Sequence, residues 1–469
     1  MSTSPRAAEP APATAHDGVP SEPQQPEQQE GRGYGPVLRE RPFLLLWLAQ
    51  VCSQTAQNAL NFGLIVEVER LTGSSTSVSL VVVSFTIPAL LLGPPAGALV
   101  DRLSKRWVLI LTNISRALLV LAFLATDRSV LAIYGLTMLN SALSQFFAPA
   151  EISTIPLVMP RRHLLAANSL FNMSFTLTQV LGFVLLGPTM LKLAGPLGLF
   201  AVVTAAYAVA ALAIMLMPRL EQHLPPAHIA LLDALRGGAL WRDLAIGFEF
   251  LRTNRAVRTM LVLLSVTIAI VYLLATLGPG YVSRVLGFSP EDAGYVLGPA
   301  GLGILLASAA IGHWGQTWDR TRLVFGGLMA MAITLPALTV VRPLFEEAAP
   351  ELAISGPAAL PPWGVAAYAG VVGLVALLIG SAFALVMVPA QTVLVEATAP
   401  HLRGRIFAVL FVLNSLWSVI PILFAAALAD IIGISQVILI VAAFVLLTAV
   451  LSLLPLLRQA RSAAEQPLQ

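Results

Sequence analysis

Charged residues are scarce in this sequence: they make up 11% of its 469 residues, whereas 57% are hydrophobic. Soluble globular domains carry roughly 25% charged residues. A chain with less than half that share cannot cover a surface that faces water throughout, but it can cover one that faces lipid. The formal net charge of only +3 gives nucleic-acid binding no electrostatic support. The composition therefore favours a membrane protein and argues against a nucleic-acid partner.

Cysteine and the signatures of enzymes are also nearly absent. Cys52 is the single cysteine, which excludes a disulfide within the chain. The sequence has no Gly-x-x-x-x-Gly-Lys loop, so nucleotide hydrolysis is not expected to drive its activity. None of the six histidines pairs with another at metal-binding spacing. We therefore expect no enzyme activity, no catalytic residues, no metal and no cofactor.

Long apolar runs, by contrast, are plentiful. A membrane-crossing helix needs about 20 predominantly apolar residues, and twelve segments qualify: 43–66, 78–100, 107–126, 130–149, 165–190, 197–217, 257–281, 292–313, 321–341, 363–388, 404–429 and 433–457. Residues 1–38 are rich in Pro, Ala, Glu and Gln and predict a disordered tail. A second tail follows at 458–469. Residues 240–254 predict an amphipathic helix on the membrane surface, within the connection 218–256.

The distribution of basic residues predicts the orientation in the membrane. With both termini in the cytoplasm, the interior segments hold 21 Lys and Arg and the exterior loops hold five, while Arg116 lies within a span. Cytoplasmic loops of membrane proteins carry such an excess. We therefore predict a multi-pass protein of the cell inner membrane, with both termini and 218–256 in the cytoplasm and 342–362 outside.

The two halves of the sequence repeat. Pro149-Ala150 precedes Pro160 as Pro389-Ala390 precedes Pro400, at an offset of 240 residues. Gly97 and Asp101-Arg102 match Gly315 and Asp319-Arg320 at an offset of 218, and one insertion the size of 342–362 reconciles the two registers. Internal repeats are frequent in transporters. The repeat predicts two six-helix units, 39–217 and 257–457.

The segment 93–106 carries a family resemblance. It reads Gly-Pro-Pro-Ala-Gly-Ala-Leu-Val-Asp-Arg-Leu-Ser-Lys-Arg and resembles the loop 2–3 signature of the major facilitator superfamily, with Ser104 where a second glycine is usual. The resemblance covers 39–457, and the strings at 248–254 and 167–170 are similar to the multidrug, macrolide and siderophore exporters. It implies an all-α membrane protein with twelve transmembrane helices in two pseudo-symmetric six-helix bundles.

The loop motif and its repeat predict a cytoplasmic gate. Asp101 can accept hydrogen bonds from the helix N-terminus that begins span 11, and pseudo-symmetry places Asp319 opposite the start of span 5. Both pairs would cross between the halves and latch the inner side shut. An ordinary positive-inside loop is the alternative. The predicted gate residues are Gly97, Asp101, Arg102, Lys105, Arg106, Arg162, Asp319, Arg320, Arg403 and Arg405.

Polar residues inside spans are costly in lipid and are candidates for the lining of a cavity. Span 1 carries several amides on one helical face, and spans 4, 5 and 11 add others. The predicted substrate-cavity residues are Gln54, Gln57, Asn58, Asn61, Asn140, Gln145, Asn172, Gln179, Asn414 and Trp417. The alternative is hydrogen bonding between helices that only holds the bundle together.

Ionisable residues inside the spans are rarer still. Glu67, at the outer end of span 1, is the candidate for proton coupling, and a permanently ionised rim carboxylate is the alternative. We expect a structural partner for Arg116 in span 3, and no acid at the centre of a cavity-lining span.

Together these features predict a secondary active transporter that exports a small amphipathic organic compound by alternating access, with protons as a candidate coupling ion. The expected partners are this substrate and the lipid bilayer. A lysolipid or lipid flippase of the same fold, a transport-inactive scaffold or sensor, and a nutrient importer stay open as alternatives.

The orientation can be tested by single-cysteine labelling in a Cys52→Ala background. We expect Pro350→Cys to react with a membrane-impermeant maleimide added from outside the cell, because 342–362 is predicted to be exterior. Reaction only from the cytoplasmic side would contradict the whole topology.

Overall fold

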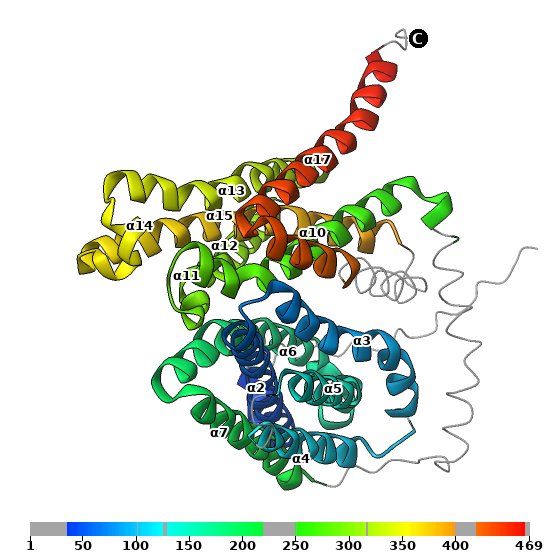
Figure 1. Cartoon of the computed structure of the whole chain (residues 1–469). Coiled ribbons are helices and arrows are strands. Elements are labelled where there is room, and N and C mark those ends of the chain that lie inside the picture. Colours follow the sequence, from blue (N-terminus) through cyan, green and yellow to red (C-terminus); the bar gives the residue numbers. More distant parts are fainter. Residues whose placement is uncertain are drawn as a thin grey trace, which may run out of the picture.

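The computed structural model describes residues 35–464, except 101, 125–128, 219–248, 250, 316–317 and 399–418. All regular elements in these ranges are helical (Figure 1). Most of the predicted tail, the linker and the first part of span 11 lie outside the described residues. Residues 35–38, predicted as tail, instead belong to the short helix α1 (Gly35–Arg39), because the side chain of Val37 is buried in the bundle.

The N-terminal half contains the first six spans. Its helices are α2 (Arg41–Thr72), α3 (Ser75–Val100), α4 (Lys105–Phe123), α5 (Val130–Val158), η1 (Arg161–His163), α6 (Leu164–Gln179), η2 (Val180–Leu186) and α7 (Gly187–Leu216). Within α7 the backbone turns at Gly195, whose φ of 64° lies in the left-handed region that glycine adopts without strain. This turn separates spans 5 and 6.

The C-terminal half repeats this arrangement. Its helices are α10 (Arg255–Gly280), η3 (Tyr281–Val285), η4 (Pro290–Asp292), α11 (Ala293–Leu297), α12 (Pro299–Trp314), α13 (Arg320–Ala348), α14 (Glu351–Ser355), η6 (Gly356–Ala359), α15 (Pro362–Glu396) and α17 (Ile434–Ala464). The described part of span 11 is the apolar helix Val419–Ile432.

The predicted fold class is confirmed. Nine helical stretches in the described part of the chain are long and apolar enough to cross a membrane, and the stretch Arg161–Leu216 contains two predicted spans. Helix α2 is not among the nine, since the polar stripe of span 1 lowers its hydropathy. Figure 1 shows the two halves as separate bundles, one in blue to green and the other in green to red.

Several helices extend beyond the spans predicted for them. Helix α5 continues to Val158 where the sequence predicts an end at 149, and both Pro149 and Pro156 lie inside it. This extension adds the buried Glu151 to the helix. The predicted span 130–149 leaves this residue out, because Pro149 does not end the helix.

The two halves meet at one end of the structure. We call this the outer end, because the loops gathered there are those predicted to be extracellular, and we call the opposite end the inner end. One cluster of buried apolar side chains includes residues of both halves, among them Val68 on α2 and Tyr281 on η3. A second cluster, which includes Phe43 and Phe171, belongs to the N-terminal half alone.

Helices α12 and α15 approach each other closely through glycine. A Cβ atom at Gly380 would collide with the backbone carbonyl of Ala300, and one at Gly303 would collide with the carbonyl of Leu377. Small residues allow such backbone contact between membrane helices. These two positions therefore fix how spans 8 and 10 pack.

This packing predicts the effect of a single methyl group. Gly380→Ala should lower the melting temperature of the detergent-purified protein, since overpacking typically costs about 1–3 kcal/mol. Gly370→Ala is the matched control on the same helix, because a Cβ there meets no atom within 4 Å. Equal melting temperatures for the two variants would contradict the close approach.

Candidate functional site

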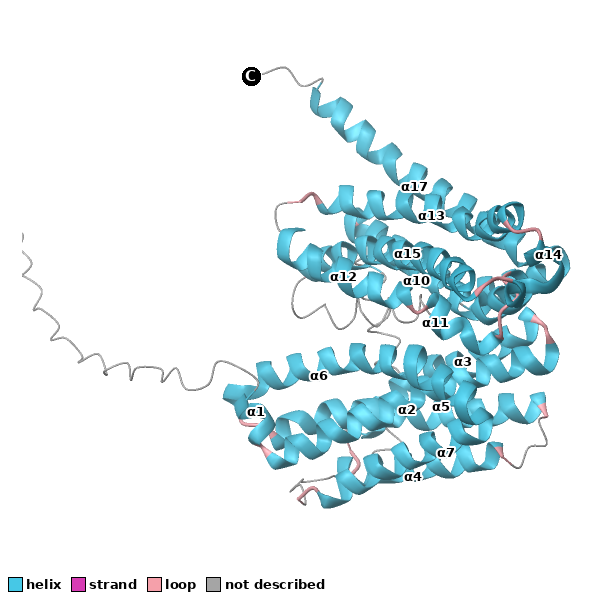
Figure 2. Ribbon diagram, turned by 90° about the vertical axis from the view of Figure 1, so that its left-hand side faces the viewer, coloured by secondary structure: helices cyan, strands magenta, loops and turns pink. Residues whose placement is uncertain are grey.

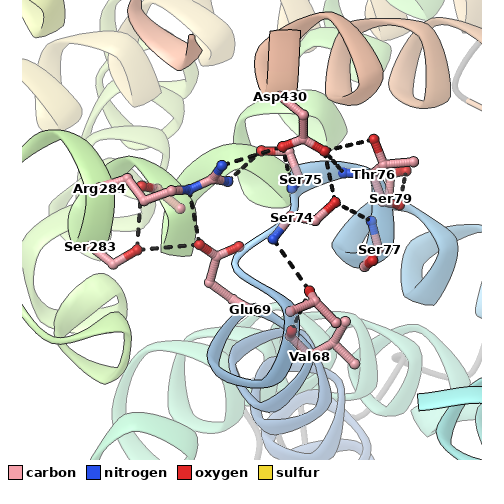
Figure 3. Close-up of polar contacts among 12 residues, drawn as sticks. Val68, Glu69, Ser74, Ser75, Thr76, Ser77, Ser79, Ser283, Arg284 and Asp430 are labelled. Carbon is pink, nitrogen blue, oxygen red and sulfur yellow. Dashed lines mark hydrogen bonds and ion pairs between the residues drawn. The ribbon is translucent and has the colours of Figure 1, made fainter.

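Asp430, in the C-terminal half, caps helix α3 of the N-terminal half. Its carboxylate accepts hydrogen bonds from the backbone N–H groups of Ser75 (2.7 Å) and Thr76 (2.9 Å). The hydroxyls of Ser74 and Thr76 donate to it as well, both at 2.7 Å (Figure 3). The first N–H groups of a helix lack partners within the helix and carry partial positive charge. An anion from the opposite half therefore completes the start of α3.

Arg284 on η3 joins this contact to the end of α2. Its guanidinium contacts the Glu69 carboxylate (Nε–Oε1, 3.1 Å) and the Asp430 carboxylate (NH1–Oδ1, 3.3 Å). It also donates a hydrogen bond to the Ser75 hydroxyl at 2.5 Å. Since Glu69 and Ser75 belong to one half and Arg284 and Asp430 to the other, the cation bridges the two halves (Figure 3).

Further polar contacts cross between the halves at the same end. Arg70 pairs with Glu291, which is almost fully buried. The Lys192 ammonium lies 2.6 Å from Asp292 Oδ1, and the hydroxyls of Thr189 and Tyr295 are hydrogen-bonded at 2.7 Å. We call this set the outer cluster: Glu69, Arg70, Ser74, Ser75, Thr76, Thr189, Lys192, Arg284, Glu291, Asp292, Tyr295 and Asp430. It closes the outer end.

Asp430, which follows the predicted span 404–429, is held in its charged form. Burial raises the pKa of Asp430, but the hydrogen bonds from Thr76, Ser74 and Ser75 outweigh this effect and hold the pKa well below its usual range. The cap on α3 is therefore anionic at any physiological pH. Glu67, the predicted proton-coupling residue, is buried near the outer cluster, with Oε2 4.0 Å from Arg70 NH1.

A second polar cluster centres on Gln57 in α2. Its side-chain oxygen accepts hydrogen bonds from Asn140 Nδ2 (3.1 Å), Ser144 Oγ (2.9 Å) and the Tyr207 hydroxyl (3.0 Å). Its amide nitrogen donates to Asn61 Oδ1 at 2.9 Å. The structure thus brings together three predicted cavity residues, Gln57, Asn61 and Asn140, and joins α2 to α5 and α7. We call these five side chains the Gln57 cluster.

The remaining predicted cavity residues of the N-terminal half lie on other faces. Asn58 Nδ2 donates to the backbone carbonyls of Gln54 (2.9 Å) and Thr178 (3.4 Å), which ties α2 to α6. Gln145 Nε2 donates to the Ser141 carbonyl within its own helix at 3.2 Å. Hydrogen bonding between helices, the alternative to a cavity lining, therefore accounts for the contact of Asn58 with α6.

Helix α6 carries its amides on an exposed face. Asn172, Thr176 and Gln179 are exposed, whereas Ser174 and Thr178 on the opposite face are buried. Figure 2 shows α6 on the side of the N-terminal half that faces α12. Lipid offers no partners for amide groups, so this polar face is suited to water or substrate between the halves.

Two residues of the loop motif and its repeat, Arg106 and Asp319, contact helix ends at the inner end. Arg106 donates to the carbonyls of Ile214 (3.4 Å) and Met215 (2.7 Å) at the C-terminus of α7, where a cation is favoured by the helix dipole. Asp319 caps its own helix by accepting from the Arg322 N–H at 3.0 Å.

Arg320, another predicted gate residue, pairs with Glu396 in its own half. Arg162 is exposed on η1, and Arg102 precedes α4, which begins at Lys105. A Cβ at Gly97 would meet nothing within 4 Å among the described residues. Asp101, Arg403, Arg405, Asn414 and Trp417 lie outside the described residues.

Sequence reasoning missed the outer cluster and the buried acid on α5. Asp430 and Arg284 stand at span ends, where single charges are unremarkable in a sequence, and only tertiary contact brings them together. The sequence signal that could have indicated a helix start at this place is the run Ser74-Ser75-Thr76, which is typical of helix N-termini. Glu151 was missed because Pro149 was taken as the end of its span.

Comparison with known proteins decides the family. The family model described as "Major Facilitator Superfamily" matches residues 46–420, which is most of the chain. The chain belongs to the major facilitator superfamily (MFS). It is a membrane transport protein and not an enzyme, because its relatives and structural neighbours are transporters.

Its relatives in the superfamily are distant. The MFS-type transporter YfiS of Bacillus subtilis (strain 168) is 24% identical over 390 residues, which cover 82% of this chain and 86% of YfiS. The nucleoside transporter NupG has a TM-score of 0.66 at 14% identity, covering 88% of this chain and 98% of that one. A bacterial homologue of the human lysosomal transporter Spinster has a TM-score of 0.65 at 14% identity, covering 88% and 96%. These structural likenesses establish the MFS fold alone.

The outer cluster predicts a change in accessibility. The labelling site is Ser79→Cys in a Cys52→Ala background, because Ser79 is buried one turn inside the cap on α3. Asp430→Ala should speed its reaction with an impermeant maleimide from the outer side by about 5–30-fold, since a lost helix cap costs about 1–2 kcal/mol.

Asp292→Ala provides the matched control for this experiment. It removes the ion pair with Lys192, whose side chain is more than half exposed. Exposed ion pairs contribute about 0–1 kcal/mol to stability. We expect a much smaller change in the reaction rate. An unchanged rate in Asp430→Ala would show that Asp430 does not hold the outer end closed.

Proposed function

We propose that this MFS transporter is a secondary active exporter of small amphipathic organic compounds, which works by alternating access in the cell inner membrane with both termini in the cytoplasm. The observation that carries this proposal is a pair of helices on the facing sides of the two halves, each with an exposed face (Figure 2). One face bears exposed amides and the other bears exposed aliphatic side chains.

The amide face belongs to α6 and the apolar face to α12. Asn172, Thr176 and Gln179 offer hydrogen bonds, whereas Leu302 and Leu306 on α12 are exposed hydrocarbon. Figure 2 shows these two helices on the facing sides of the two bundles. Ligand sites combine apolar walls with a few polar groups that fix orientation. A substrate with one polar and one apolar side fits such walls.

The closed outer cluster supports alternating access. In the conformation described here, ion pairs and the cap on α3 close the outer end, so the site between the halves would be reached from the inner end. Substrate would enter from the cytoplasm and leave after the outer cluster separates. The export direction rests on the similarity of 248–254 and 167–170 to exporters.

The cytoplasmic latch completes the proposed cycle. When the inner end closes, Asp101 would meet the start of span 11 near Arg403 and Arg405, as Asp430 meets α3 at the outer end. Energy would come from an ion or substrate gradient, with Glu67 as the proton-coupling candidate predicted from the sequence.

The substrate class can be tested in inside-out membrane vesicles with a panel of fluorescent amphipathic, purely polar and lysolipid compounds. We expect gradient-dependent uptake of the amphipathic compounds. Asn172→Leu combined with Gln179→Leu should slow it at least fivefold, because each lost hydrogen bond contributes about 1 kcal/mol.

Leu212→Ala on α7 is the control, because it changes an exposed apolar side chain elsewhere on the same half. It should leave uptake unchanged. Uptake of lysolipids alone would support a flippase instead, and no uptake of any compound by well-folded protein would contradict transport of this class.

A further inference from the structure

Two opposite charges are enclosed within the N-terminal half. Arg116 on α4 and Glu151 on α5 are only 2% and 3% exposed. Charged side chains inside membrane segments are costly and mark functional sites by default. Neither residue belongs to the outer cluster or to the amide face of α6. We call these two residues and the groups that hold Arg116 the Arg116 site.

Arg116 is held in a fixed position as a cation. It donates hydrogen bonds to Ser53 Oγ on α2 and to Asn113 Oδ1, both at 2.9 Å. Its guanidinium carbon also lies 4.5 Å from the ring centroid of Phe147 and 4.7 Å from that of Tyr207. The two aromatic rings stabilise the positive charge. These contacts hold the guanidinium in this conformation.

Glu151 is held far less completely. Its Oε1 is buried and has no hydrogen-bond partner among the described residues. Buried polar atoms in native structures nearly always have a partner, and a purely structural ion pair would be expected to satisfy both carboxylate oxygens. The unpartnered oxygen is free to accept a proton, and Arg116 is the cation whose field acts on it.

The other carboxylates on the described helices of this half, Glu67 and Glu69, lie at the outer end of α2. Helices α3 and α6 have no titratable residue within 75–100 and 164–179. Helix α2 adds Arg41 at its inner end, Cys52, and Glu67, Glu69 and Arg70 at its outer end. The remaining titratable groups of the helices around α5 are Tyr134 on α5, Lys105 and Arg106 at the inner end of α4, and Lys192 and Tyr207 on α7. Glu67 and Glu69 lie 14 and 16 residues beyond Ser53, which binds Arg116, or about 21–24 Å along α2. Among these described helical segments, Glu151 is therefore the carboxylate that acts on Arg116.

The Arg116 site is linked to the Gln57 cluster. Tyr207 stacks on Arg116 with its ring and donates its hydroxyl to the Gln57 side chain. On α5, Ser144, Phe147 and Glu151 follow at three- and four-residue spacing, so they share one helical face. The contacts of Arg116 and of the Gln57 cluster thus join α2, α4, α5 and α7 beside the α5 face that carries Glu151.

We propose that Glu151 is the proton-binding group of this transporter and that Arg116 is the positioning residue that tunes it. The inference rests on the proposed function. The carboxylate takes a proton from water on one side of the membrane and returns it to water on the other, so no further reactant is required. In the conformation described here the carboxyl is enclosed and its Oε1 has no hydrogen-bond partner, so the neutral, protonated form suits this site. Ionisation places an unpartnered negative charge in the enclosed site and disfavours this conformation.

The experiment measures conformation against pH and needs no substrate. Spin labels at Leu131→Cys and Ile354→Cys, in a Cys52→Ala background, report the distance between the outer ends of the two halves, because both positions are highly exposed. Double electron–electron resonance is recorded in nanodiscs from pH 5 to 9. We expect the outer-closed population to fall as the pH rises, by at most about tenfold per pH unit for one coupled proton.

Glu151→Gln should abolish this pH dependence, whereas Glu67→Gln should retain it. Glu151→Asp keeps a carboxylate and should retain the transition with a shifted midpoint. If Glu151→Gln is not monodisperse on size exclusion, an unchanged midpoint in Glu151→Asp decides against the proposal.

Two other outcomes overturn it. A distance distribution independent of pH in the parent protein excludes a coupled proton, and a transition that survives in Glu151→Gln assigns the proton elsewhere, for instance to Glu67 or to the outer cluster. Either result leaves the vesicle uptake of amphipathic compounds intact, so failure of this inference is distinguishable from failure of the proposed transport.

Discussion

The carboxylate of Asp430 at the start of α3 is the contact on which this conformation depends. It satisfies two backbone N–H groups and two hydroxyls of the opposite half and positions Arg284 against Glu69. Removing it would leave a helix N-terminus and a partly buried cation without their anion. Such a loss is more costly than the loss of an exposed ion pair, because the unpaired groups stay shielded from water. In the proposed alternating access, the outer end would therefore open as one unit, with all these contacts separating together.

In the proposed alternating access, the cap on α3 would also keep the two conformations nearly equal in free energy. Helix α3 begins beside Asp430 from the end of span 11, and it ends at Val100, next to Asp101, which is predicted to cap the start of span 11. Spans 2 and 11 would then exchange caps when the transporter changes state. A helix cap is worth about 0.5–2 kcal/mol. Because one cap forms as the other breaks, the difference between the states stays small, and the modest binding energy of a substrate or a proton can shift the equilibrium.

The sequence predicts the architecture well and the functional contacts poorly, for one physical reason. Apolar runs, the excess of basic residues in alternate loops and the repeat of Asp101-Arg102 at Asp319-Arg320 are local signals, so they define the membrane fold. The partners of Gln57 lie on α5 and α7, and Asp430 and Ser75 are more than 350 residues apart in the chain. Such pairs depend on helix packing, which no local pattern encodes. Glu151 shows a second kind of failure, because neighbouring helices accommodate a proline inside a membrane helix.

Helix α2 connects the separate polar sites. Ser53 binds Arg116, Gln57 accepts the Tyr207 hydroxyl and Glu69 binds Arg284, all from one helix. At about 1.5 Å per residue, the distance along the helix from Ser53 to Glu69 is about 24 Å. A helix of this length couples the Arg116 site to the outer cluster only if it has two discrete positions and each site changes the equilibrium between them. The outer cluster provides two such positions, one with its contacts formed and one with them broken. A change of charge at Glu151 that alters the hold of Arg116 on Ser53 would therefore act on the outer end through the position of α2, without any contact between Glu151 and Asp430.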